Sequence, residues 1–588
     1  MPHTIRQFAE AGRKRLLRIP FWRLVAHFVA RVFENSSDDS GEDELDLGVG
    51  ALLALLAVPG LFVTILLLDK YSSLLRMMRG GPAFNPYTAA LPDQYFYVAF
   101  SMAITGLVAV VKWQSIFPDR RDYTNLAPLP LPTRNIFMAN LIAVLAIAVL
   151  FAVDINVASS LLFPFFVHLE LPVWALFIRF AAVHALSVML ASLFAFFGLF
   201  ALTGLLMTVL PRAVFRAVSL YVRVAVIVYL IGLLVTASTV PHLVTAAHPP
   251  PLWVRLLPPV WFLGLARSLI GRSDGIFVPY AWIAIKAFGG VCLASLVLYA
   301  LSYRRHFALV PEAVEKGSRE SLLRRWLPVR RLQCLFLRGP FQKAFYPFIL
   351  TTLFRSDKHS LFFGAFFGLG VVLTSQRIAS GMNHQRAGGA LALNGDLLSA
   401  PMLLIYCMIL GLRFAFEVPA DLRANWIHRI LVDTGKHEAA VVARKMILSA
   451  VLPVILLAAM PMYIRVWGWQ VGLVQALVMV SASWFLTEYL LVKFRKIPFT
   501  CSPPHWSEHT IFSVLLCVLG MLVFSTVPAL GQWMLANPLR FLLLPPMIFA
   551  AHKWLAHLRE ENEYASELIF EDRPEPALEL LNLSGNLR

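Results

Sequence analysis

Two polar segments, each following an apolar stretch, hold the residues of this sequence that are best suited to bind another protein. The first runs from Trp113 to Leu141 and reads WQSIFPDRRDYTNLAPLPLPTRNIFMANL; the second runs from Phe416 to Asp433 and reads FEVPADLRANWIHRILVD. Each combines an aromatic residue, a proline, an acid and at least one arginine within one or two helical turns. A short amphipathic helix of this kind inserts its apolar side into a groove while its charges fix the register. Ordinary polar connections between membrane spans also contain such residues, and that alternative stays open.

The residues expected to contact such a partner are charged, aromatic or turn-forming. In the first segment they are Phe117, Pro118, Asp119, Arg120, Arg121, Asp122 and Tyr123, and in the second they are Glu417, Asp421, Arg423, Trp426 and Arg429.

Motifs for nucleotide hydrolysis and for hydrolytic catalysis are missing from the sequence. A G-x-x-x-x-G-K-[ST] phosphate loop does not occur, because Gly435-Lys436 is followed by His437 and lacks the preceding glycine. H-E-x-x-H and G-x-S-x-G do not occur either. The five cysteines have neither metal-ligand spacing nor the pattern of a disulfide framework. We therefore predict no catalytic residue, no metal site and no cofactor, so that the energy for any work must come from elsewhere.

Twelve apolar stretches between Val49 and Ala556 determine the fold class. A helix rises about 1.5 Å per residue, so about 20 apolar residues cross the roughly 30 Å hydrocarbon core of a bilayer. The composition, 59% hydrophobic and 14% charged, agrees with a polytopic membrane protein. We predict an all-α fold of about 12 transmembrane spans, arranged as two six-span repeats with an interfacial helix before each half.

The predicted spans fall into two groups of six. In the first half they are Val49–Leu68, Tyr95–Val111, Ile136–Val153, Trp174–Val209, Tyr221–Val240 and Phe277–Leu301. In the second half they are Leu361–Leu373, Leu398–Phe414, Met446–Ile464, Val471–Val492, Thr510–Val527 and Leu539–Ala556. The fourth is longer than a bilayer requires, which predicts a strong tilt or a portion lying at the surface. In the seventh, Gly364 and Gly368 form a G-x-x-x-G pattern, which predicts close helix packing.

Segments of distinct composition flank the two groups of spans. Basic and apolar residues interleave in Arg13–Phe33, a mixture typical of a helix that lies in the membrane interface. The predicted parts are a cytosolic N-terminal segment (1–48), a first six-span unit (49–301), a basic linker with a second interfacial helix at Phe341–Phe354 (302–360), a second six-span unit (361–556) and a cytosolic acidic tail (557–588).

The distribution of positive charge predicts the orientation. A net charge of +17 is also typical of nucleic-acid binding, but here lysine and arginine concentrate in alternate connections between spans. Cytoplasmic loops carry this excess, so we expect a multi-pass protein of a bacterial inner membrane with both termini in the cytosol. The first span is then an uncleaved anchor.

The two halves share a plan of an interfacial helix, two spans, a polar cytosolic segment and four further spans. An even number of spans in each half gives both halves the same orientation, so this layout is a tandem parallel repeat. Repeats related by an axis along the membrane normal often line a shared transport pathway. A transporter is therefore the leading class.

A family resemblance enters at the polar segments. Phe117–Tyr123, followed by Leu126-Ala127-Pro128-Leu129-Pro130 and a span, resembles the coupling loop of bacterial type 2 ABC (ATP-binding cassette) transporter permeases. Asp421–Ile427 resembles the matching element of a fused permease. The resemblance covers most of the chain in layout and these two loops in motif, and the chain departs from the family in carrying both six-span units.

This resemblance implies a function and a partner. The chain would be the permease of an exporter, and each polar segment would contact a separate ATPase subunit that hydrolyses ATP. Helices in the outer loop Pro241–Asp274 would cap the outer end of the pathway, although simple interface anchoring also accounts for that loop. The apolar lining favours a lipid-like or amphipathic cargo.

Two other classes stay open. An ion-coupled secondary carrier needs ionisable groups near the middle of the membrane, for which Lys286 and Glu488 are the available residues. Lys286 is a possible pathway residue or a ligand of an anionic headgroup, and snorkelling to the interface is the alternative. A membrane-embedded enzyme would use acids of the predicted outer loops, which are Asp93, Asp154, Glu170, Asp274 and Asp396.

Overall fold

The computed structural model describes most of the apolar part of the chain. The described residues are 20–34, parts of 60–71, 86–113, 132–168, 174–246, 250–271, 275–309, 337, 339–388, 395–420, 436–492, 494, 497–500 and 508–563. The first predicted span, Val49–Leu68, lies largely outside this set, as do the chain before residue 20 and the acidic tail from residue 564.

The described residues form an all-α protein that is built to reside in a membrane. Ten of the described helices are long and apolar enough to cross a bilayer. Helices suit this environment because each one satisfies its own backbone hydrogen bonds without water. The twelfth predicted span corresponds to α24 (Leu544–Glu563), which carries a lysine, an arginine and three glutamates and is not among the ten. The total of twelve spans stays a prediction.

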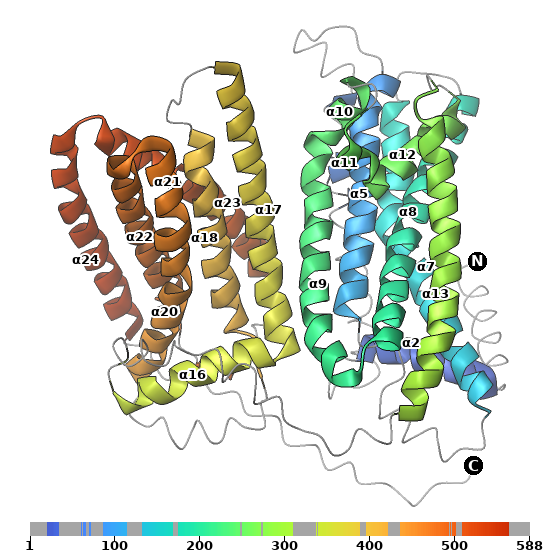
Figure 1. The fold of residues 1–588 in the computed structure, drawn as a ribbon, viewed down its shortest axis with the longest axis horizontal. Coiled ribbons are helices and arrows are strands. Elements are labelled where there is room, and N and C mark those ends of the chain that lie inside the picture. The colour runs from blue at the N-terminus through green and yellow to red at the C-terminus, as the bar shows by residue number, and fades with distance from the viewer. Residues whose placement is uncertain are drawn as a thin grey trace, which may run out of the picture. The chain divides into compact units, whose positions relative to one another are not determined.

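The chain divides into two compact units, Met1–Gly317 and Ser318–Arg588, and the division falls inside the predicted linker. The first unit contains α2 (Pro20–Glu34), α5 (Pro86–Val111), α7 (Thr133–Val167), α8 (Trp174–Val209), α9 (Arg212–Val235), η1 (Thr236–Ser238), α10 (Val240–Ala246), α11 (Leu252–Arg255), α12 (Pro258–Ile270) and α13 (Val278–Leu309). Within this unit α2 lies at one end of the bundle and α10–α12 lie at the other (Figure 1). We call these the α2 end and the α12 end.

Helix α2 packs its apolar side against the beginning of α7. Leu24, Val25 and Phe28 are buried together with Ile136, Ala139 and Ala143. Helix α7, into which the first polar segment leads, is therefore held by the amphipathic helix α2.

Helix α7 continues to Val167 instead of ending at the predicted Val153. The apolar run is interrupted by Asp154, Asn156 and Ser159, and for this reason the sequence predicts that the span ends at Val153. Asn156 accepts a hydrogen bond from Ser101 of α5 and donates one to Ser192 of α8 at 2.8 Å, so its side chain is satisfied inside the bundle. Because the polar group has partners, the helix does not need to leave the membrane there.

The predicted fourth span is a single helix, α8, with the predicted bounds Trp174 and Val209. Its 36 residues measure about 54 Å, so it exceeds the roughly 30 Å hydrocarbon core by tilting or by extending beyond it.

The second unit has its own amphipathic helix, α16 (Pro340–Arg355), which runs across one end of the bundle (Figure 1). The remaining elements are α17 (Asp357–Gly388), α18 (Gly395–Ala415), α20 (Lys436–Pro453), the π-helical segment η4 (Val454–Ala459), α21 (Met460–Trp467), α22 (Trp469–Leu491), α23 (Glu508–Leu535), η5 (Pro538–Leu543) and α24. Helix α16 is joined to α20 by hydrogen bonds from Lys445 Nζ to Gln342 Oε1 (2.7 Å) and between the hydroxyls of Tyr346 and Ser449 (2.8 Å). We call this the α16 end.

Helices α17 and α18 approach each other closely where glycine faces the neighbouring helix. A Cβ atom added at Gly381 would lie 2.6 Å from Cγ of Leu397, and one added at Gly411 would lie 2.7 Å from Cβ of Phe366. Gly370 meets α18 in a similar way. Helices α17 and α18 thus pack closely at Gly370 and Gly381 of α17 and at Gly411 of α18. Close packing through the G-x-x-x-G pair Gly364 and Gly368 stays a prediction.

This contact predicts the effect of Gly411→Val. The new side chain would collide with Cβ of Phe366, which is fixed to its backbone, so overpacking should destabilise the unit by about 1–3 kcal/mol. The matched control is Gly289→Val in α13, where an added Cβ meets nothing within 4 Å. Thermal unfolding in detergent should show a melting temperature several degrees lower for Gly411→Val than for the control. Equal melting temperatures would contradict the packing described here.

Candidate functional site

Glu417 is the only predicted partner-contact residue within the part of the chain that the structure describes. Residues 117–123 lie outside that part, and so do Asp421, Arg423, Trp426 and Arg429. Their role stays a prediction. What the structure does show is how the two ends of the second polar segment, at residues 416–420 and from residue 436 on, are attached to the helices.

The start of the second polar segment pairs with the connection between α22 and α23. The backbone N–H of Phe499 donates to the carbonyl of Phe416, and the N–H of Ala420 donates to the carbonyl of Phe499, both at 2.9 Å. Phe499 has a φ of 70°, and no other described non-glycine residue has a positive φ. That conformation costs on the order of 1–3 kcal/mol, so the surrounding contacts must hold it in place.

His359, near the start of α17, supplies one of those contacts. Its Nε2 donates to the carbonyl of Val418 at 2.8 Å, and its Nδ1 accepts from the hydroxyl of Ser356 at 2.7 Å. This tautomer is assigned from the partners, because a carbonyl oxygen only accepts. The imidazole also meets the ring of Phe499 edge-on, with 4.6 Å between centroids. We call His359, Phe499 and residues 416–420 the clamp.

Arg413 and Glu417 connect the clamp to the end of α22. Arg413 Nη1 donates to Glu417 Oε1 at 2.8 Å, one helical turn further along. Its Nε donates to the carbonyl of Leu490 at 3.0 Å, and its guanidinium lies over the ring of Phe494 at 4.7 Å from the centroid. Glu417 is thus partly occupied by an internal ion pair. Its predicted contact with a partner would have to share that carboxylate.

The helix that follows the second polar segment is attached to different elements. Arg444 of α20 lies 2.7 Å from the carboxylate of Glu488 in α22, and Arg559 of α24 contacts the other carboxylate oxygen. Glu488 has a side-chain exposure of 2%. A carboxylate buried this deeply is stable only when paired, and two arginines from two helices neutralise it. Together with the α16–α20 hydrogen bonds, these contacts tie the end of the segment to α16, α22 and α24.

The first unit has a comparable arrangement around its polar segment. Trp113, the first residue of the segment, is buried, and burial lowers the pKa of the neighbouring Lys112. At the other end of the segment, where α7 begins, Asn140 donates to the hydroxyl of Tyr299 in α13 at 2.7 Å, and the Phe137 ring stacks on Tyr299 at 4.7 Å. The start of α7 is therefore held by α2 and by α13.

Lys286 lies on an exposed face of α13 among apolar residues that include Trp282, Ile283 and Ile285. It is about 12 Å along the helix from Val278, where the apolar span begins. That position is inside the apolar length of the helix, and the role of Lys286 in a pathway stays a prediction.

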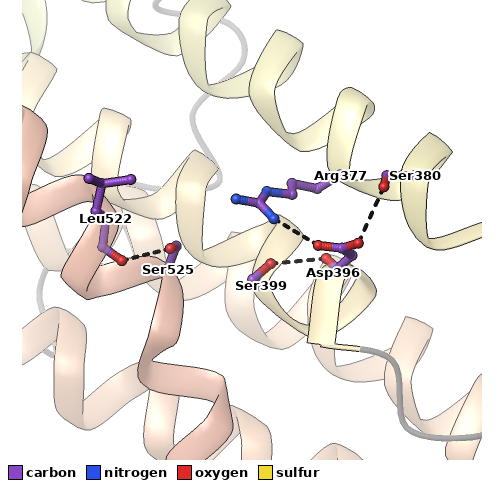
Figure 2. Close-up of polar contacts among 6 residues, drawn as sticks. All are labelled: Arg377, Ser380, Asp396, Ser399, Leu522 and Ser525. Atoms are coloured by element: carbon purple, nitrogen blue, oxygen red, sulfur yellow. Dashed lines mark hydrogen bonds and ion pairs between the residues drawn. The ribbon is translucent and has the colours of Figure 1, made fainter. Parts of the chain in front are cut away.

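The acids expected in outer loops are placed differently by the structure. Asp93 belongs to α5 and Asp154 to α7, so the prediction that they lie in loops is wrong. Asp93 contacts Lys70 and Tyr71, whereas one carboxylate oxygen of Asp154 is buried without a hydrogen-bond partner among the described residues. Asp396, in the first turn of α18, is bound by Arg377 at 2.7 Å and by the hydroxyl of Ser380 at 3.3 Å, as Figure 2 shows. Glu170 and Asp274 lie outside the described residues. In the described ranges, no group of three or more histidine, cysteine, aspartate or glutamate side chains is placed to hold a metal ion.

Comparisons with known proteins add nothing to these observations. No family model, no curated protein and no solved structure matches this chain. The function must therefore be argued from the residues and their geometry alone.

The clamp predicts the local stability of residues 416–420. Replacing His359 by alanine removes the donor to Val418 and the edge contact with Phe499, at a cost of about 1–3 kcal/mol. The amide hydrogens of Ala420 and Phe499 should then exchange roughly 5- to 100-fold faster, measured by hydrogen–deuterium exchange mass spectrometry.

The control for this experiment is His359→Gln, which keeps an N–H donor near the position of Nε2. It should restore most of the protection that alanine removes. Unchanged exchange rates in the alanine variant would show that His359 does not hold the segment.

Proposed function

We propose that this chain is the membrane-spanning permease of an ATP-binding cassette exporter, driven by a separate ATPase subunit that contacts residues 117–123 and 417–429. The cargo would be lipid-like or amphipathic, since the units offer mainly apolar surfaces. The observation that carries the proposal is the clamp. It connects the start of the second polar segment to α17 and to the α22–α23 connection through hydrogen bonds of 2.8–2.9 Å.

The attachment of both ends of that segment is what a coupling element requires. A force applied to residues 417–429 would reach α17 and α22 through the clamp and through Arg413. It would reach α16, α22 and α24 through Arg444, Lys445 and Glu488. Hydrogen-bonded and ion-paired contacts of this kind resist displacement, so the helices would move together with the segment instead of the segment moving alone.

A shared plan of the two units supports a tandem permease. In each unit an amphipathic helix at one end packs against the helix that follows the polar segment: α2 against α7, and α16 against α20. Two such units, each with a cytosolic contact segment, are what a tandem permease with alternating access requires. Because the sequence has no phosphate loop, the ATP would be hydrolysed by the partner.

One observation favours a second candidate, an ion-coupled carrier. Asp154 has a carboxylate oxygen that is buried and has no hydrogen-bond partner among the described residues. It precedes by two residues Asn156, which bonds to Ser101 and Ser192 near the middle of α5 and α8. Asp154 therefore lies at about the same depth in the bundle as Ser101 and Ser192. An ionisable group at that depth is suited to bind a coupling ion.

The two candidates differ in what drives uptake into vesicles. An ion-coupled carrier would take up cargo in response to an ion gradient without any ATPase, and Asp154→Asn would abolish that uptake. A permease would take up nothing under these conditions.

The principal test is copurification from membranes of the native host. A tagged chain should bring down a subunit with ATPase activity, and the triple substitution Asp119→Ala, Arg120→Ala and Asp421→Ala should reduce the bound activity at least about tenfold, as expected when contact residues worth more than 1.4 kcal/mol are lost. The control is Arg255→Ala. Arg255 is an exposed residue of α11 at the α12 end of the first unit, whereas α7 begins at the α2 end.

Gel filtration and thermal unfolding would establish that the triple variant is folded. Undiminished copurification by a folded triple variant would remove these residues from the contact surface. Failure of the unsubstituted chain to bring down any ATPase would contradict the proposal as a whole.

A further inference from the structure

Arg267 of α12 is a buried arginine whose binding edge is free. Its side chain lies at the α12 end of the first unit and the residue is only 7% exposed. Nη1 donates to the backbone carbonyl of Tyr87 at 2.8 Å. In the part of the chain that the structure describes, Nε and Nη2 are buried and have no hydrogen-bond partner. These two nitrogens form the side-on edge of the guanidinium, which donates two parallel hydrogen bonds to a carboxylate or a phosphate.

The guanidinium remains charged in this environment. Burial lowers the pKa of Arg267 to about 10, which still leaves it protonated at neutral pH. A buried charge without a counterion is expensive, and the usual remedy is an ion pair. The free edge of Arg267 is therefore a position at which a bound anion would be strongly stabilised.

Asp93, the described carboxylate in this neighbourhood, is already engaged. Lys70 Nζ lies 2.6 Å from it, and the hydroxyl of Tyr71 donates to the same oxygen. Burial and the charge of Asp93 raise the pKa of Tyr71 while Arg267 opposes them, so Tyr71 is a neutral phenol that lies in the field of both groups. Asp93 is thus neutralised by Lys70, and no carboxylate among the described residues is paired with the charge of Arg267.

The position of Arg267 is fixed by rigid elements. Tyr87, whose carbonyl it binds, donates its hydroxyl to His168 Nε2 at 2.6 Å, and His168 Nδ1 donates to the carbonyl of Pro164 at 2.9 Å. The Tyr87 and His168 rings both pack on Phe180 of α8. Four helices, α5, α7, α8 and α12, therefore meet around this residue, and such a scaffold holds a binding edge in one orientation.

The depth of the edge indicates which anion is available to it. Tyr87 is the second residue of α5 and precedes the apolar span Ala89–Val111. The edge therefore lies where α5 enters the apolar layer, at the level of lipid headgroups. Exposed Arg179, which donates to the carbonyl of Leu269 at 3.1 Å through Nε and 2.8 Å through Nη2, adds positive charge at the same end.

We infer that the Nε–Nη2 edge of Arg267 binds a phosphate oxyanion at the α12 end of the first unit. The phosphate belongs either to a phospholipid headgroup or to free phosphate, and both offer two oxygens to the guanidinium edge. Lys70 and Arg179 attract the anion, and Lys70 keeps Asp93 from repelling it. This inference does not depend on the proposed transport function.

The test uses the full chain purified in phosphate-free detergent solution. One arm adds sodium phosphate against sodium chloride at equal ionic strength, and a second adds phosphatidylglycerol against a phosphate-free glycolipid of equal chain length. A ligand that binds only the folded state raises the melting temperature, and native mass spectrometry counts the retained phospholipid. Stabilisation in the first arm identifies free phosphate as a source, and stabilisation in the second arm alone identifies the headgroup.

The decisive variant is Arg267→Lys, which keeps the positive charge but has no two-pronged edge. Its affinity for the phosphate source should fall at least about tenfold, which is the loss of one charge-assisted hydrogen bond. Arg255→Lys, an exposed arginine on α11, should bind as the unsubstituted chain does.

Equal stabilisation of Arg267→Lys and the unsubstituted chain would overturn the inference. So would the absence of any phosphate-dependent stabilisation of the unsubstituted chain, and this second result does not require the variant to fold.

Discussion

The attachment of residues 416–420 to His359 and Phe499 is the interaction on which the account of this protein depends. Apolar helices in a bilayer have little reason to move together, because lipid tails solvate a leucine as well as a neighbouring helix does. A segment outside the membrane can displace them only through polar contacts that are costly to break. The clamp provides such contacts at the start of the second polar segment, and the pairing of Glu488 with Arg444 and Arg559 provides them at its end.

The interior of each unit follows the same physical rule. Several polar side chains join two helices, as in the contacts among Ser101, Asn156 and Ser192 and the hydrogen bond from Tyr463 to the carbonyl of Leu398. Others, such as Thr203 and Ser483, bond to a carbonyl of their own helix. The contacts between helices fix the register of helices whose apolar surfaces alone would slide. Glycine acts in the same way at Gly381 and Gly411 by allowing α17 and α18 to approach closely.

The apolar spans could be read from the sequence because hydrophobic length is a local property. The bounds of α8 agree with the prediction, and amphipathic helices occur near both predicted interfacial positions. The span predicted for α7 is too short, because local hydropathy contains no information about the hydrogen bonds that Asn156 forms with α5 and α8. His359 and Phe499 were not recognised either. His359 is 59 residues from Val418, and Phe499 is 83 residues from Phe416 and 79 from Ala420. A lone histidine or phenylalanine carries no signal of pairing over such distances along the chain.

The central claim is that this chain transmits work that another subunit performs. The most direct measurement is ATP hydrolysis by the purified chain, first stripped of every companion and then recombined with its copurifying ATPase. If the chain transmits work done by a partner, it should show only background hydrolysis alone and sustained hydrolysis only in the recombined complex. Hydrolysis by the stripped chain at the rate of the complex would contradict it.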